Sequence, residues 1–366
     1  MLITLGLLLM ASKYEDVFVS GRMDRSGSYD TFRIPALCRT SRGTLLAMAE
    51  GRRSVSDQAA NVLVLRRKPA HSKGWLPMQV VEKDEPNSLN NPCLLPMRSG
   101  RVWLMYQRYP DGLNERTAQP GFEPEKSCRT FVTYSDDEGA SWTAPRELSK
   151  EIKSPSNRSD ASGPGIGIEL TRGTHKGRLV FPLNEGGGGK YDVFAAFSDD
   201  KGRTWKRGQD APKVIGTQPN ETQIVELTDG SILMNCRNQA SGRFRLQCRS
   251  SDGGQTWDTA TPVPELFDPI CMGSIARMSF KPDLLVSSNP NDPKVRRNGV
   301  LRTSRDGGKS WTISSVIEPG SFAYSVLCPI SKDRVGVLFE TVDDLGQGKE
   351  GYRIRYQELT LGNSDR

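Results

Sequence analysis

The chain has 366 residues, which is enough for one large β domain or two smaller ones. An apolar content of 36% excludes a disordered chain, and 36 glycines with 23 prolines argue against a mainly helical one. The formal net charge of +7 suits an anionic partner, but lysine and arginine form no long run, so the chain carries no nucleic-acid signature.

The first element is an apolar stretch at the N-terminus, from Leu2 to Ala11. It is too short to span a bilayer, and it resembles the h-region of a signal peptide without the basic n-region. We therefore predict that residues 1–11 are a signal remnant and that 12–366 form a single domain. This favours a secreted or otherwise extracytoplasmic protein and leaves a cytoplasmic one open.

Seven cysteines are scattered along the chain, and there are only two histidines. No CxxC or His-rich spacing occurs, which makes a disulfide framework and a zinc site poor interpretations. Most cysteines fall within apolar runs, so free buried thiols are expected. A cross-strand pair between Cys236 and Cys248 remains open.

Four octapeptides repeat the pattern Ser-x-Asp-x-Gly-x-Ser/Thr-Trp. They are SDDEGASW (135–142), SDDKGRTW (198–205), SSDGGQTW (250–257) and SRDGGKSW (304–311). Asp and Gly favour a tight turn, the hydroxyl can tie it, and the Trp anchors it by burying its ring. We interpret these Asp boxes as hairpin turns with a structural role.

Short alternating apolar runs of strand length lie around the boxes. Complete units are predicted at 33–67, 91–135, 165–198 and 221–250, with first strands at 33–39, 91–97, 165–170 and 221–227. A fifth unit surrounds the last box, and a sixth has runs at 324–330, 334–340 and 352–359. The first unit has a degenerate turn ending at Trp75. Six such units predict an all-β fold, a six-bladed β-propeller of four-stranded antiparallel sheets.

Several charged residues and one tyrosine fall where first strands begin, where second strands end, or in the loops that follow. In an antiparallel meander all of these positions lie on one rim, opposite the box turns. The residues are Arg33, Arg52, Asp57, Glu221, Arg237, Arg296, Arg297, Tyr324 and Glu340. We expect them to share a pocket near the propeller axis.

These motifs resemble the sialidases (exo-α-neuraminidases). The resemblance rests on the FRIP tetrapeptide at 32–35, the four Asp boxes, GPGIGIEL at 163–170 and the order of the rim residues, and it covers about residues 21–361. It implies hydrolysis of terminal sialic acid from glycoconjugates with retention at the anomeric carbon. It implies neither a metal nor a cofactor.

The resemblance further implies an arginine clamp for the sugar carboxylate. A guanidinium suits this task because its planar fork can make two parallel bonds. Arg33, Arg237 and Arg296 would form the clamp. The choice between Arg296 and Arg297 is open from spacing alone, and the family pattern favours Arg296, two residues before Asn298.

The same resemblance assigns Tyr324 as the nucleophile, Glu221 as its base and Asp57 as the general acid and base. Sialidases with a Tyr nucleophile are an exception among retaining glycosidases. A neutral nucleophile suffers less repulsion from the carboxylate beside the anomeric carbon. Arg52 would support the site, and Glu340 would orient the first arginine of the clamp.

Three other functions stay open: a sialoglycan-binding propeller without activity, a trans-sialidase, and an Asp-box propeller with another role. A binder would not need Asp57 or the Glu221–Tyr324 couple, and the last class would lack the arginine set. The expected partners are sialylated glycoproteins, glycolipids or oligosaccharides, with no nucleic acid and no membrane span.

Overall fold

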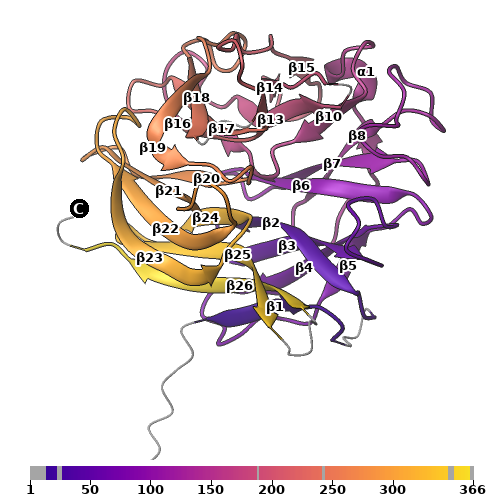
Figure 1. Cartoon of the computed structure of the whole chain (residues 1–366), viewed down its shortest axis with the longest axis horizontal. Helices are drawn as coiled ribbons and strands as arrows, with labels where there is room; N and C mark the ends of the chain where they lie inside the picture. Colours follow the sequence, from indigo (N-terminus) through magenta and orange to yellow (C-terminus); the bar gives the residue numbers. More distant parts are fainter. Residues whose placement is uncertain (1–13, 23–26, 188, 241–243, 345–349, 363–366) are drawn as a thin grey trace, which may run out of the picture.

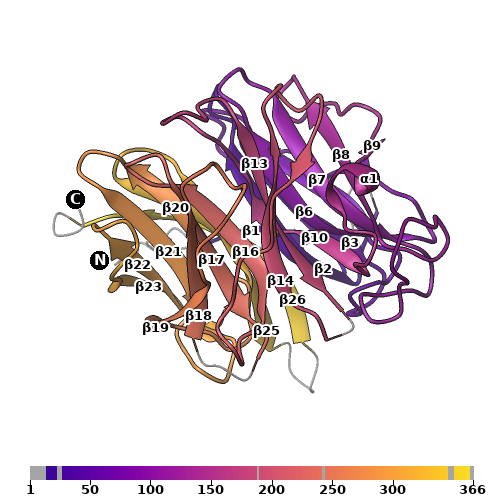
Figure 2. The same cartoon turned by 90° about the horizontal axis from the view of Figure 1, so that it is seen from above.

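Six mainly antiparallel β-sheets are arranged in a ring, and the chain passes through them in order (Figure 1). The computed structural model describes residues 14–22, 27–187, 189–240, 244–344 and 350–362. Figure 2, seen from above, shows the sheets tilted against one another, with β2 and β16 near the middle of the molecule. The prediction of an all-β six-bladed propeller is confirmed. The predicted signal remnant at 1–11 lies outside the described residues.

The first three sheets are called blades one to three here. Blade one consists of β2 (Thr31–Arg39), β3 (Leu45–Arg52), β4 (Val62–Lys68) and β5 (Gln79–Glu82). Blade two consists of β6 (Ser88–Pro96), β7 (Val102–Tyr109), β8 (Arg129–Ser135), β9 (Arg146–Glu147) and β11 (Gly165–Ile166). Blade three consists of β10 (Ser159–Ser162), β12 (Ile168–Glu169), β13 (Leu179–Gly186), β14 (Asp192–Ser198) and β15 (Lys206–Arg207). A single helical turn, α1 (Ser149–Ile152), follows β9.

The remaining sheets are blades four to six. Blade four consists of β16 (Pro219–Glu226), β17 (Ile232–Asn238), β18 (Phe244–Ser250) and β19 (Thr261–Phe267). Blade five consists of β20 (Ser274–Ser279), β21 (Leu284–Pro290), β22 (Arg297–Ser304) and β23 (Thr312–Ser321). Blade six consists of β24 (Ser325–Pro329), β25 (Arg334–Asp344), β26 (Glu350–Thr360) and β1 (Glu15–Val19). First strands contact one another around the axis, as β2 does with β6 and β24.

The ring is closed by the N-terminal strand, which appears in indigo beside the yellow β26 in Figure 1. In the antiparallel pairing of β1 with β26, Glu15 lies opposite Tyr356. Asp16 forms ion pairs with Arg353 and Arg355 at 2.5 and 2.9 Å. Only three strands were recognisable in the last unit of the sequence, and the fourth comes from the other end of the chain.

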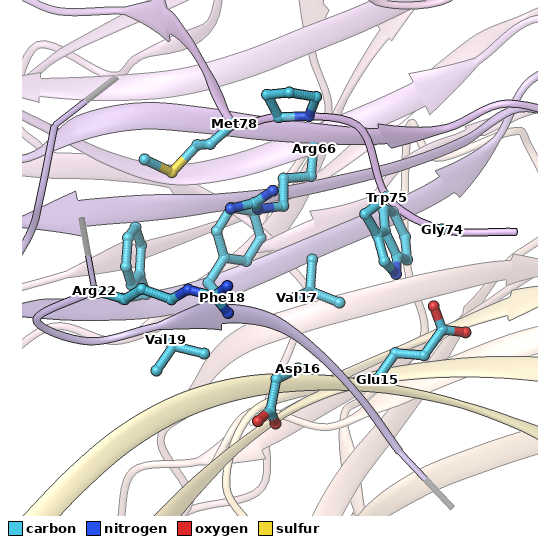
Figure 3. Close-up of a pocket in the computed structure, with 12 residues that line it drawn as sticks. Glu15, Asp16, Val17, Phe18, Val19, Arg22, Arg66, Gly74, Trp75 and Met78 are labelled. Atoms are coloured by element: carbon cyan, nitrogen blue, oxygen red, sulfur yellow. The ribbon is translucent and has the colours of Figure 1, made fainter. Parts of the chain in front are cut away.

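A cavity of about 610 Å³ follows the seam between blades six and one. Figure 3 shows side chains of β1, among them Glu15, on one side of this cavity and Trp75 on the other. Lys68 Nζ lies 2.7 Å from Glu15 Oε1, and the Trp75 ring packs edge-on against Tyr356 with centroids 5.5 Å apart. The Trp of the degenerate turn therefore helps to hold the closing blade.

Each Asp box forms a hairpin turn between the third and fourth strands of its blade, as predicted. In the second box the Ser198 hydroxyl accepts a bond from Gly202 N, and Asp200 Oδ1 accepts one from Thr204 N, at 2.8 and 2.9 Å. Gly202 has φ +88°, and a Cβ there would lie 2.3 Å from the ring of Trp103 in blade two. The box glycine thus serves both the turn and the packing of neighbouring blades.

Two expectations need correction. Residues 165–170 were predicted as the first strand of blade three, but β13 pairs there with two short strands, β10 and β12. Only β12 lies within the predicted range, and residues 165–166 pair in parallel with β6 of blade two. The reason is that Ser159–Ser162 is polar yet buried, so it carries no apolar alternation. The disulfide left open between Cys236 and Cys248 does not form, since all seven cysteines are buried free thiols.

Among the described residues, no helix has the length and apolar character to cross a membrane.

Candidate active site

A cavity of about 310 Å³ lies at the rim where first strands begin and second strands end. It is smaller than the seam cavity of Figure 3, which contains none of the predicted site residues. Five of the six blades contribute to its lining, which is mostly polar. Its lining includes Ile34 and Arg52 from blade one, Asn90 and Tyr109 from blade two, Ser159 and Asn184 from blade three, Glu221 and Arg237 from blade four, and Tyr324 beside blade six.

The structure brings eight of the nine predicted rim residues to this cavity or its immediate border, and the exception is Arg297. Arg52, Asp57, Glu221, Arg237 and Tyr324 line it directly. The remaining three border it: two guanidinium groups lie over the Tyr324 ring, each 5.4 Å from the centroid, and one carboxylate pairs with the first of them. These three residues are Arg33, Arg296 and Glu340.

Tyr324 and Glu221 form a direct couple. The phenolic Oη of Tyr324, which is 5% exposed, donates a short hydrogen bond to Glu221 Oε1. Arg237 Nη1 donates to Glu221 Oε2 at 2.6 Å and to Tyr324 Oη at 3.0 Å. Burial, and then the charge of Glu221, raise the pKa of Tyr324 well above its usual value. Tyr324 is therefore neutral in the empty site, with a proton acceptor already in place.

Arg33 is held by a carboxylate from the opposite end of the chain. Its Nε lies 2.9 Å from Glu340 Oε1, and the same oxygen accepts a hydrogen bond from Ile34 N at 2.7 Å. Burial lowers the pKa of Arg33, but Glu340 outweighs this and raises it. Glu340 N in turn donates to Tyr324 O at 2.9 Å, which ties the arginine to the tyrosine.

The FRIP tetrapeptide has a local conformation that explains its sequence. Ile34 has φ +58°, which is unfavourable for a β-branched residue, and it precedes Pro35. The pairing of β2 with β3 shifts register between Arg33 and Ala36. The hydrogen bond from Ile34 N to Glu340 accompanies this turn, so strain in the backbone is located next to the site.

The structure separates the two candidate arginines of blade five. Arg296 lies over the Tyr324 ring and donates from Nη2 to Ile270 O at 2.6 Å. Arg297 begins β22, is 62% exposed at its side chain and forms an ion pair with Asp292 at 2.8 Å. Arg296 lies in the bend that precedes β22, where Arg297 N donates to Val295 O at 2.9 Å, and of the two arginines it is Arg296 that faces the tyrosine.

Asp57 lies at the mouth of the cavity, with its side chain 71% exposed. Its Oδ1 accepts a hydrogen bond from Arg52 Nη1 at 2.8 Å. Desolvation by the surrounding chain raises the pKa of Asp57, but the positive charges of Arg52, then of Arg33 and Arg296, hold the pKa below its usual value. The carboxyl is therefore ionised in the empty site at neutral pH.

Two carboxylates near the site were not predicted from the sequence. Glu50 is completely buried below Arg52, and Glu115 lines the cavity from the loop after β7. Burial, and then the charge of Glu221, raise the pKa of Glu115. The only sequence signal for Glu50 was a charged residue inside the apolar run of β3. No group of three or more metal-ligating side chains occurs among the described residues.

The chain is similar to known proteins along most of its length. The family model described as a BNR repeat-like domain matches residues 43–337. A sialidase of Micromonospora viridifaciens is 30% identical over 362 residues, covering 95% of this chain and 53% of that protein. A solved Hadza microbial sialidase has a TM-score of 0.78 and 26% identity, covering 91% of this chain and 66% of its own.

A second solved structure, an intramolecular trans-sialidase from Ruminococcus gnavus, has a TM-score of 0.80 at 20% identity, covering 96% of this chain and 98% of its own. That likeness concerns the fold alone. The chain spans about half the length of the Micromonospora relative. Since the family model covers most of the propeller, and the curated relative is a sialidase, the chain belongs to the sialidase family of BNR-repeat proteins.

Proposed function

We propose that the chain, from residue 12 to 366, is one catalytic domain: an exo-α-sialidase that hydrolyses terminal sialic acid from glycoproteins, glycolipids or oligosaccharides with retention. The observation that carries this proposal is the hydrogen-bonded couple of Tyr324 and Glu221 beneath the guanidinium groups of Arg33 and Arg296. A binding protein would need the arginines but not a nucleophile already paired with its base.

The three arginines would bind the carboxylate on the anomeric carbon. Charge-assisted hydrogen bonds of this kind contribute about 1.5–3 kcal/mol each. Arg33 and Arg237 are each paired with a carboxylate, Glu340 and Glu221, which reduces repulsion in the empty site. Substrate would then place the anomeric carbon over Tyr324.

In the first step Tyr324 Oη would attack the anomeric carbon while its proton passes to Glu221 Oε1. The bond from that carbon to the leaving oxygen breaks, and Asp57 would donate a proton to this oxygen. In the second step water would attack the same carbon and give a proton to Asp57, while the bond from that carbon to Tyr324 Oη breaks and Glu221 returns its proton to the phenolate. Two displacements on opposite faces give overall retention.

Asp57 must be protonated to act as an acid, although its pKa is low in the empty site. The substrate carboxylate would neutralise part of the positive field of Arg33 and Arg296. Its binding would therefore raise the proton affinity of Asp57 when the acid is needed. Binding of the substrate carboxylate would therefore promote protonation of the catalytic acid.

The experiment is to incubate the protein with a fluorogenic aryl sialoside, with and without lactose, and to follow fluorescence and the sugar products. Release of free sialic acid with retained configuration, and its loss in Tyr324→Phe, is expected. Binding without release would indicate a lectin. Sialyllactose as product would indicate an intermolecular trans-sialidase, and a 2,7-anhydro sugar an intramolecular one.

A further inference from the structure

Glu50, the third residue from the end of β3, is 0% exposed and lies directly behind the predicted acid. Arg52 separates them and is itself 1% exposed. Arg52 donates from Nε to Glu50 Oε2 at 2.8 Å, and its Nη2 lies 2.6 Å from the same oxygen. The remaining nitrogen, Nη1, donates to Asp57 Oδ1 at 2.8 Å. One guanidinium therefore bridges a fully buried carboxylate and an exposed one.

Two asparagine side chains make a second connection between the same residues. Asn61 Nδ2 donates to Glu50 Oε2 at 3.2 Å and to Asp57 O at 2.6 Å. Asn90 Nδ2 donates to Glu50 Oε1 at 3.3 Å and to Asp57 O at 2.7 Å. The backbone N of Asn91 completes the set at 2.7 Å. Glu50 thus accepts from donors on β3, β6 and the loop before β4.

We propose that Glu50 is a positioning residue for the general acid: through Arg52, Asn61 and Asn90 it holds Asp57 against the leaving group and balances the charge of Arg52. This inference rests on the proposed function, in which Asp57 is the acid. Glu50 touches no substrate, because it is completely buried beneath Arg52.

The charge of Glu50 matters as much as its shape. Arg52 is buried between two carboxylates, so the negative charge of Glu50 neutralises part of its positive charge. Without Glu50, the full charge of Arg52 would act on Asp57 and lower the proton affinity of that carboxylate. Burial raises the pKa of Glu50 to about 7 and Arg52 opposes this shift, so the ionised form depends on the guanidinium.

The test is Glu50→Gln, which keeps the size of the side chain and removes the charge. We would measure kcat/KM across pH on sialyllactose, whose leaving oxygen needs a proton, and on an aryl sialoside, whose leaving oxygen does not. The loss should be at least about fivefold greater on sialyllactose, which is less than the 10²–10⁴-fold of positioned acid catalysis because Asp57 itself is retained. The alkaline limb of the sialyllactose profile should move to lower pH, because Asp57 binds its proton less tightly.

Two further variants test whether Glu50 acts through Asp57. In an Asp57→Ala background, Glu50→Gln should cause no additional selective loss, since residues that act through one another are not additive. Glu226→Gln is the matched control, because Glu226 is 5% exposed and accepts hydrogen bonds from the backbone N of Thr171 and of Arg172, away from the cavity. It should affect both substrates equally.

Equal losses on the two substrates for Glu50→Gln, with unequal losses for Asp57→Ala, would overturn this inference and leave the proposed function intact. Equal losses for Asp57→Ala would overturn the acid role and this inference with it. If circular dichroism shows that Glu50→Gln does not fold, Glu50→Asp decides by the same criterion, because it keeps the charge but draws it away from Arg52. Equal losses of kcat/KM on the two substrates in Glu50→Asp would likewise refute the positioning role of Glu50.

Discussion

Glu340, within the second strand of blade six, lies 2.9 Å from Arg33, in the first strand of blade one. The two residues are more than 300 positions apart, and closure of the ring brings them together. Glu340 is 4% exposed and serves both the guanidinium and the amide of Ile34. The first arginine of the clamp is therefore fixed before substrate arrives, which lowers the cost of binding an anion.

This relationship predicts the effect of Glu340→Gln. Loss of the charge should free Arg33 to move and should raise KM, with kcat/KM reduced about tenfold or more, equivalent to ~1.4 kcal/mol. Steady-state kinetics on an aryl sialoside would check this. Glu358→Gln removes an exposed partner of Arg334 and should leave kinetics unchanged. An unaltered KM in a folded Glu340→Gln variant would contradict the orienting role.

The third clamp residue can be identified with two alanine variants. Arg296→Ala should lower kcat/KM at least about tenfold, because a charge-assisted contact to the carboxylate is lost. Arg297→Ala should have little effect, since its side chain is 62% exposed and bound to Asp292. Both variants remove one positive charge, so long-range electrostatics cancel in the comparison. A larger loss for Arg297→Ala would identify Arg297 as the third clamp residue in place of Arg296.

The Tyr324–Glu221 couple predicts different kinetic effects for removal of the nucleophile and for removal of its base. Tyr324→Phe should abolish turnover of sialyllactose and of the aryl sialoside alike, because no leaving group replaces a nucleophile. Glu221→Gln should lower kcat on both substrates by about 10²–10⁴-fold. Binding of a planar dehydrated sialic acid, measured by calorimetry, should persist in Tyr324→Phe. Equal turnover in wild type and Tyr324→Phe would exclude the tyrosine mechanism.

Asp160 predicts how stability depends on pH. It is completely buried in β10, with one bond from Asn157 Nδ2 at 2.7 Å, and burial raises its pKa to about 7. Its folded-state pKa exceeds the unfolded value, so its stabilising effect is complete below about pH 4 and is lost as pH rises through 7. The loss is about 4 kcal/mol at most. Urea unfolding should show Asp160→Asn gaining stability relative to wild type between pH 5 and pH 8. The same difference at both pH values would refute the shift.

The packing of the Asp boxes predicts a difference between two glycine substitutions. Gly202→Ala places a methyl group 2.3 Å from Trp103 at φ +88°, whereas Gly112→Ala at φ +71° meets no atom within 4 Å. Both suffer backbone strain of about 1–2 kcal/mol, and only the first adds overpacking of about 1–3 kcal/mol. Thermal unfolding should therefore show the larger loss for Gly202→Ala. Equal losses would mean that the box glycine serves the turn alone.

Local signals in the sequence determined the number of blades and the positions of most strands. Turn chemistry in the Asp boxes and alternation in the runs around them act over a few residues, so they can be recognised without the fold. Together with FRIP they also placed the candidate rim residues. Box two shows why: its turn is held by Ser198, Asp200 and Thr204, which lie within seven positions of one another.

The tertiary structure decided what depends on distant pairing and on the direction of side chains. The pairing of β1 with β26 joins residues about 340 positions apart, and β10 is a buried strand without apolar alternation. Arg296, in the bend before β22, lies over the Tyr324 ring, whereas Arg297, the first residue of that strand, pairs with Asp292. The sequence does not distinguish Glu50 from other acidic residues, whereas in the structure three separate segments supply hydrogen-bond donors to it. Burial and long-range contacts set these properties, because desolvation and hydrogen bonding depend on neighbours that only the folded ring assembles.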